Sequence, residues 1–452
     1  MKFKVLFLIS IFLILGSRLN AASPKDFLNV SNSFYSNKLC LYSTFVSQNK
    51  DNDSLKLYIF YKLPLNNYLF VQSNKGSYFA SYTLEVSFAD VDGVVRLHKI
   101  ITDTISSPKP QENTYNFNFR EGFFEFDIPN LNYNLSVRAI DNNTKNQEKT
   151  NLIYLNKTTT KNKVNEFSYL FTEKDANNNY SPIILNNALN FSANPIRIYF
   201  SLNPKFVTTA NKIQIKKIQK EESNYWANNF NYDGNLIPAE NNSLSIIDKG
   251  NNQITVEVAE NTETKVSAGS NFNENPTLFY LDFPNNDFVP GEYEVKITNN
   301  WKDTLVANIN CVWDDEPLSL KNLKFAQQIS RIFLNEDEMD KITSGDNVES
   351  FQNLIKVWEK FNPNPKVVYN DVMVQFYKRV DFAYFNYSTF SERNGAASDK
   401  GKIYILYGKP DNIEQAFRNG KLYEIWTYEK LIKEFSFESV DSGIFKLVDL
   451  KQ

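Results

Sequence analysis

Histidine and cysteine are almost absent from this chain of 452 residues, which contains one histidine and two cysteines. His98 lies in an expected strand, far in sequence from the acidic cluster at residues 399–424, so we expect neither a Ser-His-Asp triad nor a histidine-rich zinc site. The two widely separated cysteines also argue against zinc fingers and iron–sulfur clusters. Cys311 falls on the inward face of an expected strand, so a small buried side chain is favoured over a disulfide with Cys40.

Long apolar runs are missing after the N-terminus, and no segment beyond residue 22 has 18 consecutive apolar residues. The mature chain should therefore have no membrane-spanning helix. The net charge is only −3, which gives no reason to expect a nucleic acid or an anionic membrane surface as a partner. The sequence also lacks a phosphate-binding loop and a dinucleotide fingerprint, so no cofactor is expected.

The N-terminus has the pattern of a signal peptide. Lys2 and Lys4 precede an apolar run over residues 5–15, and Ala21 and Ala22 provide small residues for cleavage. We therefore expect residues 1–22 to be removed during export. No cysteine adjoins this point, so a lipid anchor is not expected. The pattern predicts an exported protein of the periplasm or cell surface of a bacterium.

Period-two alternation of apolar residues predicts two all-β domains, at residues 23–145 and 166–314, joined by a linker at 146–165 that contains one short strand. Strands are expected at residues 57–63, 82–88, 94–101, 124–128 and 133–139 in the first domain. In the second, a turn at Pro290 and Gly291 opens a hairpin whose partner strand is residues 305–313. Short strands at this spacing favour a tandem pair of immunoglobulin-like sandwiches.

After a charged, proline-terminated stretch at residues 314–317, the apolar period changes to that of helices, and a domain over residues 318–452 is expected. Asp346 should cap a helix whose core face carries Val348, Phe351, Ile355 and Trp358. A longer helix follows at about residues 367–387, with a core face of Val372, Phe376, Val380, Ala383 and Tyr387.

The end of the chain should form a small antiparallel sheet. We expect a strand at residues 403–407, a turn at Gly408 and Pro410, and a short helix capped by Asp411 with Glu414. Further strands are expected at 423–428, around 435–437, and at 444–448. The predicted fold class is thus multidomain: two all-β sandwiches followed by an α+β domain of helices and then a small sheet.

The C-terminal part resembles the GWxTD-domain family of exported bacterial proteins. The resemblance covers about residues 318–449 and rests on Trp358, the 362–365 proline break, Asn370-Asp371, Arg379-Val380, residues 402–408, Pro410-Asp411, residues 423–426 and Tyr428. The name motif here reads Gly395-Ala396-Ala397-Ser398-Asp399, so alanine and serine replace its tryptophan and threonine. A ligand stacked on that tryptophan in relatives would have no such platform here. The family has no established activity, so the resemblance implies an architecture and not a function.

Four carboxylates, those of Asp399, Asp411, Glu414 and Glu424, surround the expected small sheet. A pair of them would suit acid–base catalysis or calcium, but each has a structural reading. Asp411 and Glu414 form a helix cap, Asp399 a turn acceptor, and Glu424 an outward strand residue. Asp90, Asp92 and Gly93 resemble part of a calcium loop, although a hairpin turn is favoured, and no metal site is predicted. Arg379 either pairs with Asp399 or is solvated.

Aromatic residues offer a different type of site. Tyr404, Tyr407, Trp426 and Tyr428 either form a sugar- or peptide-binding face or pack in the core, which is the commoner role at alternating strand positions. The leading expectation is a non-enzymatic envelope protein that binds a protein or glycan partner, with candidate binding residues Arg379, Gly395, Asp399, Tyr407, Gly408, Pro410, Asp411 and Trp426. The alternatives are a hydrolase of an envelope polymer, using Asp399 and Asp411, and a carrier of a small ligand.

Overall fold

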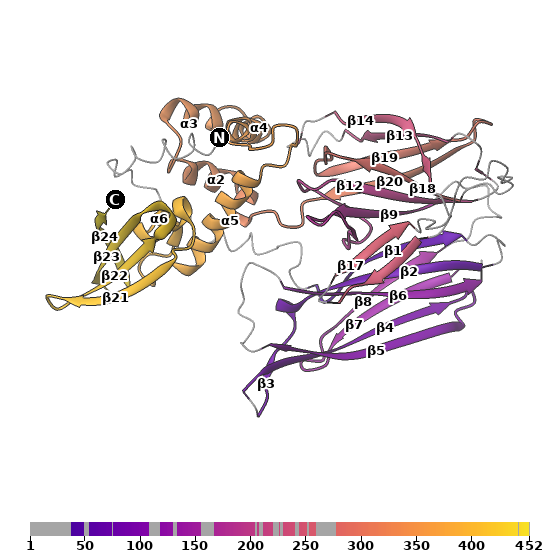
Figure 1. The fold of residues 1–452 in the computed structure, drawn as a ribbon, viewed down its shortest axis with the longest axis horizontal. Helices are drawn as coiled ribbons and strands as arrows, with labels where there is room; N and C mark the ends of the chain where they lie inside the picture. The colour runs from indigo at the N-terminus through magenta and orange to yellow at the C-terminus, as the bar shows by residue number, and fades with distance from the viewer. Residues whose placement is uncertain are drawn as a thin grey trace, which may run out of the picture. The chain divides into compact units, whose positions relative to one another are not determined.

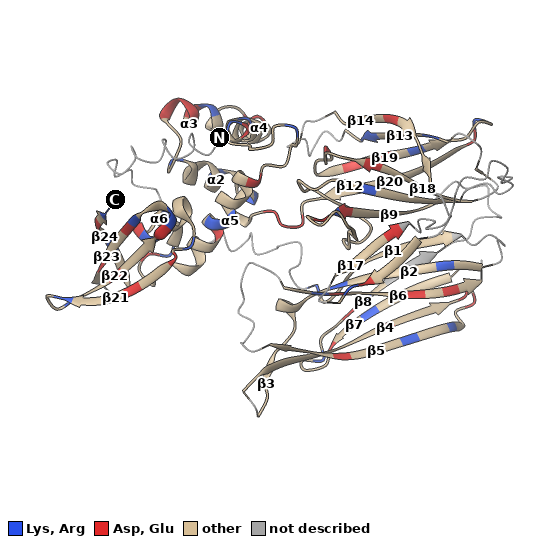
Figure 2. Ribbon diagram, in the orientation of Figure 1, with Lys and Arg blue, Asp and Glu red and all other residues tan. Residues whose placement is uncertain are grey.

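The computed structural model describes residues 38–48, 54–74, 76–107, 118–129, 133–154, 167–203, 206–207, 211–219, 226, 229–239, 244–250, 253–258, 277–441 and 443–451. The expected signal peptide lies outside these residues. The described chain forms two compact units. The larger contains Tyr35–Asp314 with Lys366–Tyr369, and the smaller contains Asp315–Pro365 and Asn370–Gln452. Each is mostly or partly β-sheet (Figure 1), and acidic and basic residues are interspersed along their strands (Figure 2).

The first part of the larger unit consists of two sheets packed face to face. One sheet has the order β1-β2-β6, and the other has the order β3-β4-β7-β8 with β5 paired to β4. The bounds are β1 Leu41–Gln48, β2 Ser54–Pro64, β3 Val71–Gln72, β4 Tyr78–Ala89, β5 Val95–Ser107, β6 Phe119–Pro129, β7 Tyr133–Asp141 and β8 Gln147–Tyr154. The five predicted strands are confirmed. Strand β8 extends the sheet into the stretch expected to be a linker.

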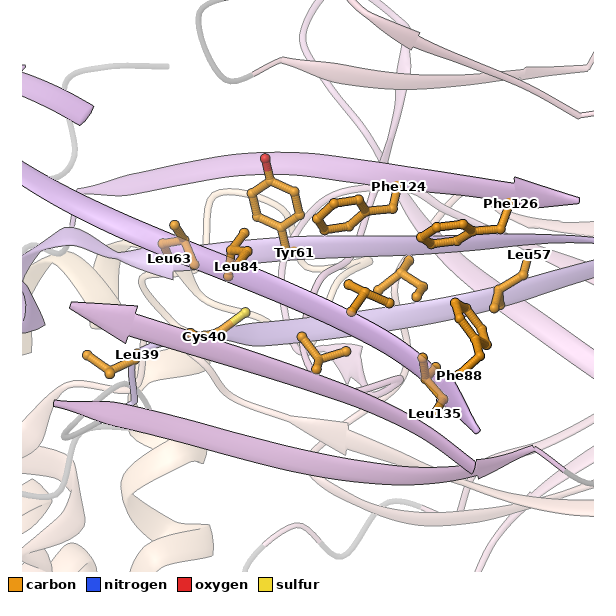
Figure 3. Packing of buried hydrophobic residues seen from close by; sticks show 14 of the residues in the cluster. Leu39, Cys40, Leu57, Tyr61, Leu63, Leu84, Phe88, Phe124, Phe126 and Leu135 are labelled. Carbon is orange, nitrogen blue, oxygen red and sulfur yellow. The ribbon is translucent and has the colours of Figure 1, made fainter. Parts of the chain in front are cut away.

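Alternation explains the core of this sandwich. Every second residue of β4 is buried from Ala80 to Phe88, because successive side chains of a strand point to opposite faces. The inward residues of β2, β4, β6 and β7 meet in one apolar cluster, in which Phe88 contacts Phe126 with ring centroids 5.0 Å apart (Figure 3). His98 is exposed on β5, as expected for a strand-surface residue.

The second part of the larger unit is again built from two main sheets. Their orders are β10-β9-β12-β18-β15 and β11-β20-β19-β13-β14, and β16 and β17 form a separate hairpin. The bounds are β9 Phe167–Lys174, β10 Tyr180–Pro182, β11 Leu189–Asn190, β12 Ile196–Leu202, β13 Lys212–Lys217, β14 Asn231–Asn235, β15 Ile237–Pro238, β16 Leu244–Asp248, β17 Ile254–Val258, β18 Leu278–Phe283, β19 Gly291–Thr298 and β20 Thr304–Val312. The predicted hairpin is present as β19 and β20, in register from Gly291–Cys311 to Thr298–Thr304.

The β1-β2-β6 sheet is buried on both faces. Phe45, Tyr58 and Phe60 point away from the first core and join a cluster with residues of the second part, including Leu170, Tyr199 and Leu278. The free edge of β1 is covered as well, since its Thr44 amide donates to Asn187 Oδ1 at 2.7 Å and its Val46 amide donates to Ser168 Oγ at 2.9 Å. Side chains thereby satisfy backbone groups that an exposed edge would leave open.

Both cysteines are buried as free thiols. Burial raises the pKa of the Cys40 thiol to about 12 and also raises the pKa of Cys311. These thiols are therefore protonated and unreactive at neutral pH. The prediction that Cys311 is a small core residue is confirmed: it is 3% exposed on the inward face of β20.

The smaller unit begins with helices. They are the 3₁₀ turn η2 Leu318–Lys321, α2 Leu323–Ser330, α3 Glu336–Thr343, α4 Asn347–Glu359 and α5 Asp371–Asn386. Asp346 caps α4 as predicted, accepting from the amides of Val348 and Glu349 at 2.9 Å each. Phe376, Val380 and Ala383 on the predicted core face of α5 are buried as expected. Val372 is 40% exposed, and the buried face also includes Met373, Val374 and Tyr377. The chain then continues through the turn η3 Gly395–Ala397 and helix α6 Asp399–Tyr407.

A four-stranded antiparallel meander ends the chain. Its strands are β21 Asn412–Arg418, β22 Lys421–Tyr428, β23 Lys433–Asp441 and β24 Ile444–Lys451, with the 3₁₀ turn η4 Glu429–Leu431 between β22 and β23. The last three strands are confirmed. The predicted strand at 403–407 is wrong, because Ser398 caps a helix there. The predicted helix after Asp411 is also wrong, because that segment is β21.

No helix in the part of the chain that the structure describes is long and apolar enough to cross a membrane.

Candidate functional site

The loop between α5 and α6 holds the motif positions and is tightly packed. A side chain at Gly395 would collide with the backbone of α5 at Ala383 O, and one at Gly401 would collide with Gly395 O. Glycine is needed at both positions because backbone approaches backbone. Ala396 is 0% exposed. The residue that stands in place of the family's tryptophan is therefore a core residue here.

Ser398 and Asp399 fasten this loop to α6 and to the sheet. The Ser398 hydroxyl accepts from the Gly401 amide at 3.0 Å and donates to Gly395 O at 2.6 Å. The first interaction is an N-cap of α6. Asp399 Oδ2 accepts from the amide of Leu447 on β24 at 3.0 Å. The carboxylate of Asp399 thus binds a strand, and not the turn that was predicted for it.

A cavity of about 110 Å³ lies next to this loop. Its lining comes from the end of α5, the loop, the start of α6 and the β23–β24 turn: Asn386, Tyr387, Ser388, Thr389, Glu392, Ser398, Lys400, Gly443, Ile444 and Phe445. The volume suits one side chain or a few waters and is smaller than typical ligand sites. Phe390, between two lining residues in the sequence, is 95% exposed.

Lys400 connects the cavity to the core of the sheet. Its ammonium group lies 2.8 Å from Glu424 Oε1, with both side chains 13% exposed, and 3.4 Å from the centroid of the Phe445 ring. The same Glu424 oxygen accepts from Trp426 Nε1 at 2.7 Å. Burial lowers the pKa of Lys400, and the bond to Glu424 opposes that change. The prediction that Glu424 points outward is wrong, because its strand position faces α6 together with Trp426.

Arg379 has a role that neither sequence reading anticipated. Its Nη1 lies 3.4 Å from the carbonyl oxygens of both Ile405 and Leu406, in the last turn of α6. A cation there satisfies free carbonyls and complements the helix dipole. Gly408 ends the helix with φ = +81°, and a Cβ on it would lie 3.1 Å from the Arg379 guanidinium carbon. Arg379 and Asp399 form no ion pair with each other, since their described partners are backbone groups.

The residues after α6 also serve the fold. Tyr428 donates its hydroxyl to Gly408 O at 2.8 Å. Pro410 is buried, and Asp411 Oδ2 accepts from the Glu429 amide at 2.8 Å. Asp411 therefore caps a turn after β22 rather than a helix.

The four candidate aromatics pack against other rings. Tyr404 stacks on Phe382 with centroids 4.4 Å apart, and Tyr407 contacts Phe435 at 5.1 Å. Trp426 and Tyr428 are buried in the cluster with Ile403 and Phe437. The core reading is thus favoured over an open sugar-binding face.

Asp399 is the first residue of α6, and Asp411 lies four positions beyond its last residue, Tyr407. Their carboxylates bind amides in different parts of the sheet, at Leu447 on β24 and at Glu429 after β22. This arrangement does not support a pair of facing acids as in glycoside hydrolases. Among the described residues there is no group of three or more histidine, cysteine, aspartate or glutamate side chains that could hold a metal ion. At the stretch that resembles part of a calcium loop, Asp90 Oδ1 accepts from the Asp92 and Val94 amides, in agreement with the hairpin turn that was favoured.

Asp381 is a buried acid that sequence reasoning missed. It is 4% exposed on α5, and its two oxygens accept from the amides of Leu318 at 2.6 Å and Ser319 at 2.8 Å. Burial raises the pKa of Asp381 to about 7, against the effect of these hydrogen bonds. It anchors η2 to α5. Asp381 lies next to Val380 and near Ala383 in the sequence, and a charged residue within this apolar stretch of α5 is the feature from which its burial could have been predicted.

Residues 291–444 match the family model of the GWxTD domain. No curated protein matches the chain. Among solved structures, a match is found to trypsin-activated alpha-2-macroglobulin from Escherichia coli, with 5% sequence identity and a TM-score of 0.15. It covers 61% of this chain and 17% of that one, and at this TM-score it supports no structural argument.

Proposed function

We propose that this chain, whose residues 291–444 match the GWxTD domain, is an exported cell-envelope protein that binds a partner protein through the loop between α5 and α6. In this proposal two immunoglobulin-like β modules precede the binding domain. Export is supported by the apolar run and small residues at positions 5–22. Binding is supported by the cavity beside the loop and by Phe390.

Phe390 is the observation that carries the binding proposal. It is 95% exposed, and Ser388, Thr389 and Glu392 around it line the cavity. Aromatic side chains, phenylalanine included, are enriched at the core of protein interfaces, where a few large side chains supply most of the binding energy. Gly395, Ser398 and Asp399 contact backbone groups of α5, of the loop and of β24. These contacts fix the position of the loop that carries Phe390.

A protein partner is favoured over a glycan because the aromatics that could stack on a sugar are packed against neighbouring rings. The hydrolase alternative has no support from the geometry, since the carboxylates of Asp399 and Asp411 bind separate backbone amides, those of Leu447 and Glu429. Within this proposal, Gly395 and Asp399 support the binding loop, while Arg379, Gly408 and Trp426 stabilise the domain beneath it.

Photo-crosslinking in intact cells tests this proposal. A photoreactive amino acid replaces Phe390 in one variant and Val372, 40% exposed on α5 of the same domain, in a matched control. We expect a discrete protein adduct from position 390 and not from position 372. Absence of any adduct at 390, or the same adducts from both positions, would remove the support for a binding site at this loop.

A further inference from the structure

Strand β21 forms one edge of the C-terminal sheet, and no other strand among the described residues covers its outer side. Its described pairing is with β22, from Asn412–Thr427 to Arg418–Lys421. The two strands are joined by Asn419 and Gly420, whose φ angles of 52° and 75° are those of a type I′ turn. Strand β21 lies at the border of the sheet, and the hairpin projects from it (Figure 1).

The pairing with β22 determines which backbone groups of β21 face outward. In a two-residue hairpin the pair next to the turn, Arg418–Lys421, exchanges both hydrogen bonds, and every second pair does so along the ladder. At the far end of the hairpin, the Asp411 amide donates to Thr427 O at 2.9 Å. The carbonyl of Thr427 therefore points toward β21, as this alternation of hydrogen-bonded pairs requires. The N–H and C=O groups of Ile413, Gln415 and Phe417 therefore point to the open side.

The side chains at these positions are symmetric about Gln415. Ile413 is 50% exposed and Phe417 is 77% exposed, and both lie on the face of the sheet that carries Trp426. The strand contains neither lysine nor proline, the two residues that most often protect edge strands.

The opposite edge, β24, is protected. Asp399 Oδ2 accepts from the outward amide of Leu447, and β24 carries Lys446 and Lys451. Of the two edges, only β21 is open to another strand. The cavity beside Phe390 is lined by residues of the β24 side, three strands and about 14 Å away.

We propose that β21 pairs antiparallel with β21 of a second copy of this chain, in the register that places Gln415 opposite Gln415. The outward groups of Ile413, Gln415 and Phe417 then match those of Phe417, Gln415 and Ile413, giving six backbone hydrogen bonds. Ile413 lies opposite Phe417 twice, as an apolar cross-strand pair. The result is a two-fold symmetric, continuous sheet of eight strands.

Charges on the other face agree with this register. In this register, Glu414 of each copy is a diagonal neighbour of Arg418 of the other copy, which gives two pairs of opposite charge. The two Glu414 residues are also diagonal neighbours, which gives one pair of like charge, so attraction outweighs repulsion. One strand per copy buries less area than a stable interface of about 1,200 Å² or more. We therefore expect a weak dimer, with a dissociation constant on the order of 10–100 µM.

Sedimentation of the full-length protein at about 1–200 µM tests the proposal. We expect wild type to dimerise with concentration. Gln415→Pro should stay monomeric with its fold intact, because the lost N–H faces outward and proline is tolerated on an edge. Phe417→Lys should do the same. Ile432→Lys, which replaces another exposed apolar residue, is the matched control and should dimerise like wild type.

Oxidative cross-linking then tests the register. In an antiparallel pair the two Gln415 Cα atoms are about 5.5 Å apart, within disulfide range. Gln415→Cys should give a covalent dimer and Ile432→Cys should not, while the native thiols are buried. A wild type that is monomeric throughout, an undiminished dimer of Gln415→Pro, or equal cross-linking at 432 would overturn the proposal. A monomer that pairs β21 with a strand of another protein would also overturn it. A negative result for the dimer does not affect the binding proposal for Phe390, because that site lies at the opposite edge of the sheet, next to β24.

Discussion

The buried carboxyl of Asp381 should make the smaller unit lose stability as pH rises from about 4 to about 7. Burial raises the pKa of Asp381 from its ordinary value of 3.8 to about 7 in the folded protein. Between these values the folded state binds more protons than the unfolded state, so the free energy of unfolding falls with increasing pH. This contribution is fully present below pH 4 and lost above pH 7.

The size of the effect follows from the two pKa values. They differ by about three pH units at about 1.4 kcal/mol each, which sets an upper limit of about 4 kcal/mol. The amides of Leu318 and Ser319 donate to the two oxygens at 2.6 and 2.8 Å and favour the charged form. We therefore expect about 2–4 kcal/mol between pH 4.5 and pH 8.5.

The variant Asp381→Asn isolates this residue from other titrating groups. Asparagine has one acceptor oxygen, so its NH₂ group would face one of the two backbone amides. We expect the variant to be less stable than wild type by about 1–3 kcal/mol at pH 8.5. The deficit should grow toward pH 4.5, because wild type gains stability there and the variant does not.

Urea denaturation of the full-length protein and of the variant, at both pH values, provides the measurement. The smaller unit contains Trp358 and Trp426, and the larger unit contains the other three tryptophans, so the fluorescence transition that shifts in Asp381→Asn is assigned to the smaller unit. A matched control is Asp449→Asn on β24, an exposed position, which keeps Asp381 and should therefore lose stability between pH 4.5 and pH 8.5 as wild type does. A deficit of Asp381→Asn that stays constant or shrinks toward pH 4.5 would mean that the two amides keep the carboxyl charged, and would refute the reasoning.

Three other predictions concern the ion pair, the end of α6 and export. Lys400→Met or Glu424→Gln should each cost about 2–4 kcal/mol in urea denaturation, because each leaves a mostly buried charge unpaired; Lys451→Met in the more exposed pair with Glu434 should cost less than about 1 kcal/mol. Equal costs would contradict the assignment of Lys400 as a buried partner. Gly408→Ala should lower stability more than Gly420→Ala does, because Gly408 has φ = +81° and ψ = −158°, a conformation that essentially only glycine adopts, and its Cβ would also lie against Arg379. The comparison is a pair of thermal melts, and equal losses would argue against this strain at Gly408. N-terminal sequencing of envelope fractions should find a mature chain that starts near Ala22 or Ser23, and an intact Met1 would exclude cleavage.

Strands of the larger unit could be predicted because one face of each is buried. Alternation in β4, from Ala80 to Phe88, and in β20, from Leu305 to Cys311, maps directly onto buried and exposed positions. The immunoglobulin-like form of these modules stays a prediction. The cover over β1 could not be predicted, because Asn186, Asn187 and Ser168 are ordinary loop and strand residues until the fold brings them to that edge.

The strand propensity of residues 403–407 gave a wrong prediction, because the helix cap and tertiary packing favour a helix there. Ile403, Ile405 and their tyrosine neighbours favour a strand, yet the Ser398 cap and the packing of α6 on α5 make this segment a helix. Two signals compete after Pro410. The Asp411–Glu414 spacing favours a capped helix, whereas Asn419-Gly420 is a strong hairpin signal that favours a strand before it, and the strand β21 is what forms.

The chemistry of the candidate site was also beyond the sequence. The contacts from Arg379 to α6, Asp399 to β24 and Lys400 to Glu424 each join residues at least 24 positions apart in the sequence. Their partners depend on tertiary packing and not on a local pattern. The sequence indicated which residues cluster near the small sheet but not that their polar groups are used by the fold.

The central claim is that the loop between α5 and α6 binds a partner and that Asp399 is structural. The most direct test is the affinity for the partner that is cross-linked at position 390, measured for full-length wild type, Phe390→Ser and Asp399→Asn. Phe390→Ser should weaken binding at least tenfold while leaving the melting temperature unchanged, because the side chain is 95% exposed. Asp399→Asn should lower the melting temperature and leave the affinity of the folded protein close to that of wild type. Full affinity in Phe390→Ser, together with loss of binding in a stably folded Asp399→Asn, would contradict this account.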